Sequence, residues 1–430
     1  MVGVFGRERG GSRLTAVLNS RRVPSRASLP WLLPASASIL FILAGLVFSF
    51  GNLGLPGQAP GWWFMPTDLW ATWHNAQFVS WGRLGQVYAA HTQLMALPGI
   101  AILLSPLAWL ADRAGLHSGW PIETAHPGAW LVLDPAALAA GSSVLWALDL
   151  WARKLGLDTK TRAALLVVET AVTFVAVAPM GHPEDLVALA LLLYAMDRAD
   201  QGRFAQAGWL AGAALATQQL AALGAGVVVA LAISNRNGRS TTSTLWAIGA
   251  RAVAVPGALA AWCLIAAPGA TWSHLVAGHS SNPWPTPLGA LAPGGDAGPL
   301  RLAELLGAAM AGVALRKGSG GGADLVWWTG IAFSMRVLEP LQTPYYLTPA
   351  MALFALAAFA AGRWQRAILT AILAAGIGIA TGPFQEGHPW ALWITILAFT
   401  ALAAAASAPF GSEGSKIVSE RPQEELPQPQ

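Results

Sequence analysis

Long apolar stretches separated by short polar segments repeat along most of the chain. Their apolar positions are continuous rather than alternating, which favours transmembrane helices over the strands of a membrane barrel. A bilayer core about 30 Å thick needs roughly 20 apolar residues per helix. The pattern therefore predicts an all-α, polytopic transmembrane helix bundle of about 12 spans, at 31–50, 131–151, 163–180, 185–198, 204–216, 219–233, 243–266, 300–315, 324–338, 345–361, 366–381 and 389–407.

Two segments decide how these spans thread the membrane. Segment 93–111 either spans, or lies re-entrant or in the interface, and segment 204–233 is either one long span or a hairpin of two short ones broken at residues 217–219. Basic residues gather in cytoplasmic loops. This rule favours a non-spanning 93–111 and a hairpin at 204–233, with both termini cytoplasmic. Five of the 25 lysines and arginines then lie elsewhere: Arg83, Arg113, Arg251, Arg301 and Arg336.

This topology divides the chain into three parts. Residues 1–30 are rich in Arg, Gly and Ser without an apolar core, which predicts a disordered cytoplasmic leader rather than a signal peptide. Residues 31–408 form the transmembrane domain, and residues 409–430 form a disordered cytoplasmic tail. The first external loop, 51–130, is long and rich in Trp, so we expect it to carry interfacial helices.

Composition supports a multi-pass plasma-membrane protein. Only 11% of the residues are charged and 55% are hydrophobic, with a mean hydropathy of +0.51, whereas a soluble domain carries about 25% charged residues. The net charge of +4 comes mainly from short loops and predicts no nucleic-acid surface. The single cysteine, Cys263, excludes an intrachain disulfide framework and a Cys-based zinc site.

The stretch PTDLWATWHN contains Asp68, the first acid after Glu8, together with His74. An acid beside a membrane is costly unless it is solvated or used. Asp68 suits a general base that takes a proton from an acceptor hydroxyl. The alternative is that Asp68 only caps a helix over residues 69–80.

The motif GHPED places His182, Glu184 and Asp185 between two predicted spans. These side chains could bind a hydroxyl or a phosphate-bound metal, or move a proton. Capping is again the alternative, because Pro183 and acids suit the first turn of a helix. A cap needs only one acid, which favours a functional site here.

Three further segments place polar side chains among apolar ones. Gln218 and Gln219 lie in ALATQQLAAL, which suits either a helix break facing a cavity or hydrogen bonds between helices. Asp134, Asp149 and Glu169 are acids inside predicted spans, with no partner evident in the sequence.

The segment MRVLEPLQTPYYLTPA contains Arg336, Glu339, Tyr345 and Tyr346. The planar guanidinium of Arg336 suits a phosphate group. Glu339 could instead be its salt-bridge partner. Two prolines, Pro340 and Pro344, interrupt the helix and are expected to bring this loop beside the first two sites.

Three stretches resemble one family: PTDLWATWHNAQFVSWGRLGQVY, GHPEDLVALALLLYAMDRADQGRFAQAGWLAGAALATQQ and MRVLEPLQTPYYLTPAMAL. Their order and topology are similar to those of GT-C class membrane glycosyltransferases, above all the actinobacterial polyprenyl-phosphate-mannose-dependent mannosyltransferases. The resemblance implies a GT-C-like fold and a hexosyltransferase that moves mannose, or another pentose or hexose, from a polyprenyl-phosphate donor. An extracytoplasmic glycolipid or glycan would be the acceptor.

The resemblance also implies roles for individual residues. Asp68 matches the catalytic acid of the first external loop, and Glu184 and Asp185 match the acidic second loop. The family often has a lysine where this chain has residues 217–219, so Arg336 is expected to replace that cation. The remaining residues assigned to substrate or phosphate are His74, His182, Gln218, Gln219, Glu339, Tyr345 and Tyr346.

Phosphate is already a good leaving group, so this chemistry requires no cofactor, although a divalent cation is compatible with it. Two other functions compete with a transferase. If the chain is a lipid or solute transporter or flippase, we expect paired discontinuous helices and charges near the membrane midplane. If the chain is instead a divergent, non-catalytic membrane protein, we expect that Asp68, Glu184 and Arg336 do not converge on one cavity.

Overall fold

A computed structural model describes the chain at residues 30–51, 67–89, 97–116, 129–235, 238–275, 298–317, 322–338, 344–384 and 389–409. These residues are helical, with no strands among them, which confirms the all-α prediction. The predicted leader and tail lie outside the described residues, apart from Pro30 and Pro409.

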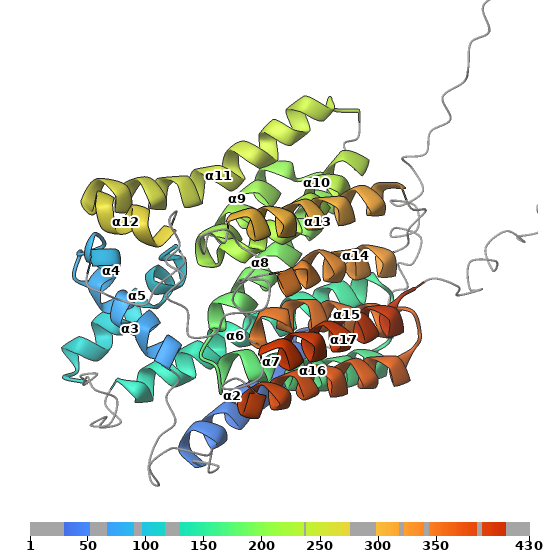
Figure 1. Cartoon of the computed structure of the whole chain (residues 1–430), viewed down its shortest axis with the longest axis horizontal. Helices are drawn as coiled ribbons and strands as arrows, with labels where there is room; N and C mark the ends of the chain where they lie inside the picture. Colours follow the sequence, from blue (N-terminus) through green and yellow to red (C-terminus); the bar gives the residue numbers. More distant parts are fainter. Residues whose placement is uncertain are drawn as a thin grey trace, which may run out of the picture.

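Helices follow one another along the whole described chain (Figure 1). The first half contains α2 (Leu32–Gly51), α3 (Thr67–Ser80), α4 (Gln86–Ala89), α5 (Gly99–Arg113), α6 (Trp130–Lys154), α7 (Thr159–Val177), α8 (Pro183–Asp200) and α9 (Phe204–Thr217). The second half contains η3 (Gln219–Gly224), α10 (Ala225–Ser234), α11 (Thr241–Ala266), α12 (Pro268–Leu275), α13 (Gly298–Lys317), α14 (Gly322–Ser334), η6 (Met335–Leu338), η7 (Pro344–Leu347), α15 (Thr348–Ala360), α16 (Trp364–Phe384) and α17 (Pro389–Ser407).

Every predicted span coincides with helix, and segment 93–111 also contains one, α5. The predicted break at residues 217–219 is confirmed: α9 ends at Thr217, Gln218 is extended with φ −149° and ψ 116°, and a 3₁₀ helix follows. The backbone groups freed by such a break need partners inside the protein.

Three described helices are long and apolar enough to cross a membrane: Leu32–Ser49 in α2, α6 and α11. Their surfaces agree with this, because many large apolar side chains point away from the protein. On α11, Trp246 is 75% exposed and Ile265 is 85% exposed. Exposed apolar surface on this scale in water would promote aggregation. The structure therefore supports a membrane protein.

Helices α3, α4, α5 and α12 gather at one side of the bundle (Figure 1). A small separate core includes Phe78 of α3, Val87 and Tyr88 of α4, and Cys263 of α11. The much larger main core takes buried residues from α3 and α5 as well as from the rest of the bundle, and α15 is buried along almost its whole length.

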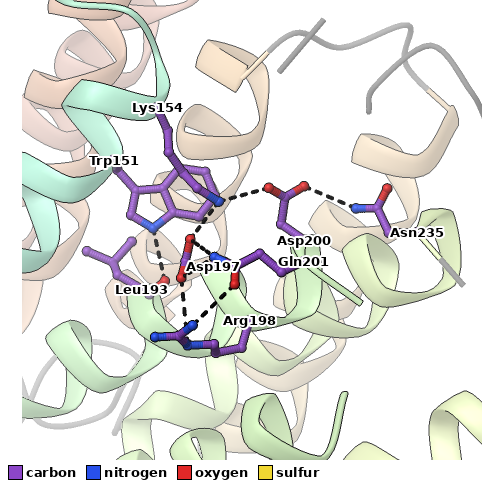
Figure 2. A network of polar contacts seen from close by, with 8 residues as sticks. All are labelled: Trp151, Lys154, Leu193, Asp197, Arg198, Asp200, Gln201 and Asn235. Atoms are coloured by element: carbon purple, nitrogen blue, oxygen red, sulfur yellow. Dashed lines mark hydrogen bonds and ion pairs between the residues drawn. The ribbon is translucent and has the colours of Figure 1, made fainter. Parts of the chain in front are cut away.

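Helix α8 runs through the main core, and charged clusters lie at both of its ends. Figure 2 shows the cluster at the C-terminal end. Lys154 Nζ lies 2.6 Å from Asp197 Oδ1 and 2.9 Å from Asp200 Oδ2. The Gln201 amide donates to both oxygens of Asp197, and Asn235 donates to Asp200. This cluster ties α6 and α10 to α8.

A second ion pair stabilises the same end of α6. Arg162 donates to both carboxylate oxygens of Asp149, at 2.8 and 2.9 Å, and Asp149 is fully buried. Asp149, which showed no partner in the sequence, is thus a structural acid that joins α6 to α7. A bidentate pair of this kind satisfies a buried carboxylate well.

Replacing Lys154 with Met is expected to lower the free energy of unfolding by about 3 kcal/mol, because the buried Asp197 loses its nearest cation. The measurement is thermal unfolding in detergent, followed by tryptophan fluorescence. Lys160→Met is the control, since Lys160 is exposed on α7. Equal midpoints for the two variants would contradict the structural role of Lys154.

Candidate functional site

Asp68 lies in the first turn of α3, and its side chain is 50% exposed. Its Oδ2 atom lies 2.8 Å from Nε2 of His182, a residue 114 positions further along the chain. The carboxylate therefore does more than start a helix, because it also joins α3 to the beginning of α8.

The backbone before α8 explains how His182 reaches this position. Gly181 has φ +75°, a left-handed conformation that glycine adopts easily, and it turns the chain after α7. The His182 amide then donates to the carbonyl of Ala176 at 2.8 Å. Pro183 occupies the first turn of α8, where its missing N–H is not needed. His182 makes no capping hydrogen bond with its side chain, which is left to contact acids.

Glu184 holds the other side of the same imidazole. Its Oε1 lies 2.5 Å from Nδ1 of His182, and its side chain is 9% exposed. Asp68, His182 and Glu184 therefore form a continuous row, here called the acid–histidine row. Burial alone would lower the pKa of His182, but the charges of Glu184 and Asp68 and their hydrogen bonds raise that pKa well above its ordinary value.

An aromatic stack extends from this row. The ring of Tyr345 lies on that of His182, with centroids 3.9 Å apart and planes 15° apart. Tyr346 packs edge-on against Tyr345 at 4.6 Å. The guanidinium carbon of Arg336 lies 4.0 Å from the centre of the Tyr346 ring. The structure thus brings Arg336, Tyr345 and Tyr346 to the site of Asp68 and Glu184.

Arg336 also faces a carboxylate that the sequence did not single out. Its Nη1 atom lies 3.7 Å from Oε2 of Glu304 on α13, and both side chains are 4% exposed. Glu339, the partner considered from sequence, lies outside the described residues. Glu304 could have been noticed as an acid inside the predicted span 300–315, by the same rule that singled out Asp134 and Glu169.

Asp185 connects the row to the broken helix. The Gln218 side-chain amide donates to Asp185 Oδ1 at 2.8 Å, and both residues are buried. Glu184, His182 and Arg336 all lie within electrostatic range of Asp185. The start of α5 touches the same break, because a Cβ at Gly99 would collide with the end of α9. The break in α9 therefore aims Gln218 at the site.

Two buried carboxylate oxygens in the cluster have no hydrogen-bond partner among the described residues: Glu184 Oε2 and Asp185 Oδ2. Buried polar atoms are almost always paired with protein, water or a ligand. These oxygens could accept hydrogen bonds from the hydroxyl groups of a bound molecule.

Two other residues assigned from sequence lie apart from these contacts. His74 stacks on Trp70 at 5.1 Å and meets Phe78 at 4.7 Å, so its described ring contacts lie within α3. Gln219 is exposed in η3, whereas its neighbour Gln218 turns inward.

The described residues contain no group of three or more His, Cys, Asp or Glu side chains arranged to hold a metal ion. Comparison of the sequence with protein-family models and with curated proteins finds no match. The chemistry of the acid–histidine row and of the side chains around it therefore has to be inferred from their geometry.

Replacing Gln218 with Leu is expected to lower the free energy of unfolding by about 2 kcal/mol, because Asp185 Oδ1 loses its donor in a buried setting. The adjacent Gln219→Leu is the control, since Gln219 is exposed. Thermal unfolding in detergent compares the two, and similar midpoints would remove Gln218 from this role.

The acid–histidine row also predicts a pH dependence of stability. Because folding raises the pKa of His182, the protonated ring contributes fully to the free energy of unfolding below about pH 6.5, the ordinary pKa of histidine. That contribution declines as the pH rises through the raised pKa. The difference in unfolding midpoint between the wild type and His182→Gln should therefore shrink from pH 6 to pH 9. A difference that stays constant over this range would contradict the assignment.

Proposed function

We propose that this protein is a GT-C-like membrane glycosyltransferase. It would move a sugar from a polyprenyl-phosphate donor to a glycolipid or glycan acceptor on the extracytoplasmic side. The observation that carries the proposal is the half-exposed carboxylate of Asp68, held by the largely buried His182–Glu184 pair. An isolated helix cap would not need such support.

Asp68 acts as the general base in this proposal. One of its oxygens is bound to His182, and the exposed remainder of the carboxylate is free to meet an acceptor hydroxyl. As that hydroxyl oxygen attacks the anomeric carbon, its proton passes to Asp68. The bond from the anomeric carbon to the phosphate oxygen breaks, and the polyprenyl phosphate leaves with the electron pair. The anomeric configuration is inverted.

Arg336 is assigned to the donor phosphate. Gln218, which stands at the break where the family often has a lysine, donates its side-chain amide to Asp185. Arg336 supplies a positive charge on the other side of the aromatic stack, over Tyr346. A guanidinium matches the geometry of phosphate oxygens.

The proposed topology places about 12 spans in the membrane, with both termini in the cytoplasm. The acid–histidine row at the N-terminal end of α8 would then face outward. The Lys154 cluster lies at the C-terminal end of the same helix (Figure 2). By the rise of an α-helix, those two ends are about 27 Å apart. This separation is close to the thickness of a bilayer core.

One observation favours a transporter as a second candidate. The α9–α10 segment is interrupted at Gln218, and discontinuous helices are typical of transporter binding sites. Uptake of a labelled lipid-linked sugar into vesicles, without transfer of the sugar, would support this candidate instead.

Replacing Asp68 with Asn is expected to reduce sugar transfer about 10²- to 10⁴-fold, because Asn cannot accept the proton. The assay uses membranes of an actinobacterial strain that overproduces the protein. They are incubated with radiolabelled polyprenyl-phosphate mannose, and labelled products are separated and counted.

Asp158→Asn is the matched control. Asp158 is an exposed N-cap of α7, and Asn caps a helix as well as Asp does. Unchanged transfer by the Asp68 variant would remove Asp68 from the role of base. Absence of transfer by the wild type, with this donor and with other hexose donors, would overturn the proposed function.

A further inference from the structure

Both ring nitrogens of His182 are within hydrogen-bond distance of a carboxylate oxygen, at 2.8 and 2.5 Å. A neutral imidazole carries only one N–H. The two hydrogen bonds in this row therefore need two protons. With these two protons shared among Asp68, His182 and Glu184, the row carries one net negative charge. This follows from the geometry alone.

The imidazole is also fixed by its surroundings. Its side chain is 13% exposed, and the ring of Tyr345 covers one face. The charged groups around it come from separate elements. Asp68 belongs to α3, Glu184 and Asp185 belong to α8, and Arg336 on η6 lies near Asp185.

We propose that His182 is the positioning residue for Asp68, acting as an imidazolium that Glu184 anchors. It holds Asp68 Oδ2, so that the other oxygen of the carboxylate is presented to the acceptor hydroxyl. This inference rests on the proposed function, and it replaces the role in phosphate binding that the sequence suggested for His182. Both N–H groups of the ring are already used by carboxylates, which leaves none for a phosphate.

The proton balance of the reaction supports this arrangement. The acceptor O–H bond breaks and an O–H bond forms on Asp68, while His182 keeps both of its protons. The charge of the row changes from −1 to zero as the phosphate leaves with its electron pair. The imidazolium does not enter the covalent steps. It fixes where the proton is received.

Positioning matters here because Asp68 stands at the exposed start of a helix. Without His182 its side chain can adopt several rotamers, and a misplacement of about 1 Å can reduce a rate about 10²-fold. The expected effect of losing His182 is therefore a fall in kcat of about this size, with little change in the KM for the donor.

The test is a double-mutant cycle in the same transfer assay, with Asp68→Asn, His182→Gln and the two combined. If His182 acts through Asp68, His182→Gln lowers kcat about 10²-fold in the wild type but adds no further loss to Asp68→Asn. If the kcat losses of the two single variants multiply in the double variant, the positioning role is overturned. A raised KM for the donor with unchanged kcat in His182→Gln would also overturn it. Glu184→Gln should reproduce part of the loss, because it removes the anchor.

A second measurement does not depend on activity. In protein with ¹⁵N-labelled histidine in nanodiscs, the signal lost in His182→Gln identifies His182. We expect both of its ring nitrogens to carry protons at pH 7.5 in the wild type, and not in Glu184→Gln. A neutral ring in the wild type would overturn the inference.

If the wild type transfers no sugar, the proposed function fails. If it transfers sugar and His182→Gln keeps its kcat, only the positioning role fails.

Discussion

The contact between Asp68 and His182 ties the exposed start of α3 to the beginning of α8. Helix α3 packs mainly with α5, and both helices contribute buried residues to the main core that α8 runs through. An exposed carboxylate contributes little by itself. Against a largely buried imidazole that is held by Glu184, the same carboxylate has a defined position and a defined charge. The remaining features of the candidate site are arranged around this contact.

Helix α8 explains why charged groups can be present in such an apolar protein. The middle of the helix is apolar and buried, and its acids lie in the first and last turns. These acids have partners at both ends: the N-cap His182 and Gln218, which follows α9, at one end, and Lys154 of α6 at the other. Burying an unpaired charge is costly, so the pairs also determine which helices can pack beside α8.

Most of the helices were predictable because the signal for them is local. An apolar stretch long enough for a helix, with a glycine, proline or charged cluster at its ends, needs no distant partner to be recognised. The break at Gln218 belongs to this class, since three polar residues interrupt an apolar run. The short helix α12 lies outside every predicted span, because its few residues depend on packing.

The sequence by itself determined that the chain is helical and apolar enough for a membrane, and it marked Asp68, His182, Glu184 and Arg336 as polar residues that needed an explanation. Only the tertiary structure decided how they pair. It placed His182 between two carboxylates, and it put Glu304 beside Arg336. The physical reason is that helix formation depends on neighbouring residues, whereas a contact across 114 residues depends on how whole helices pack.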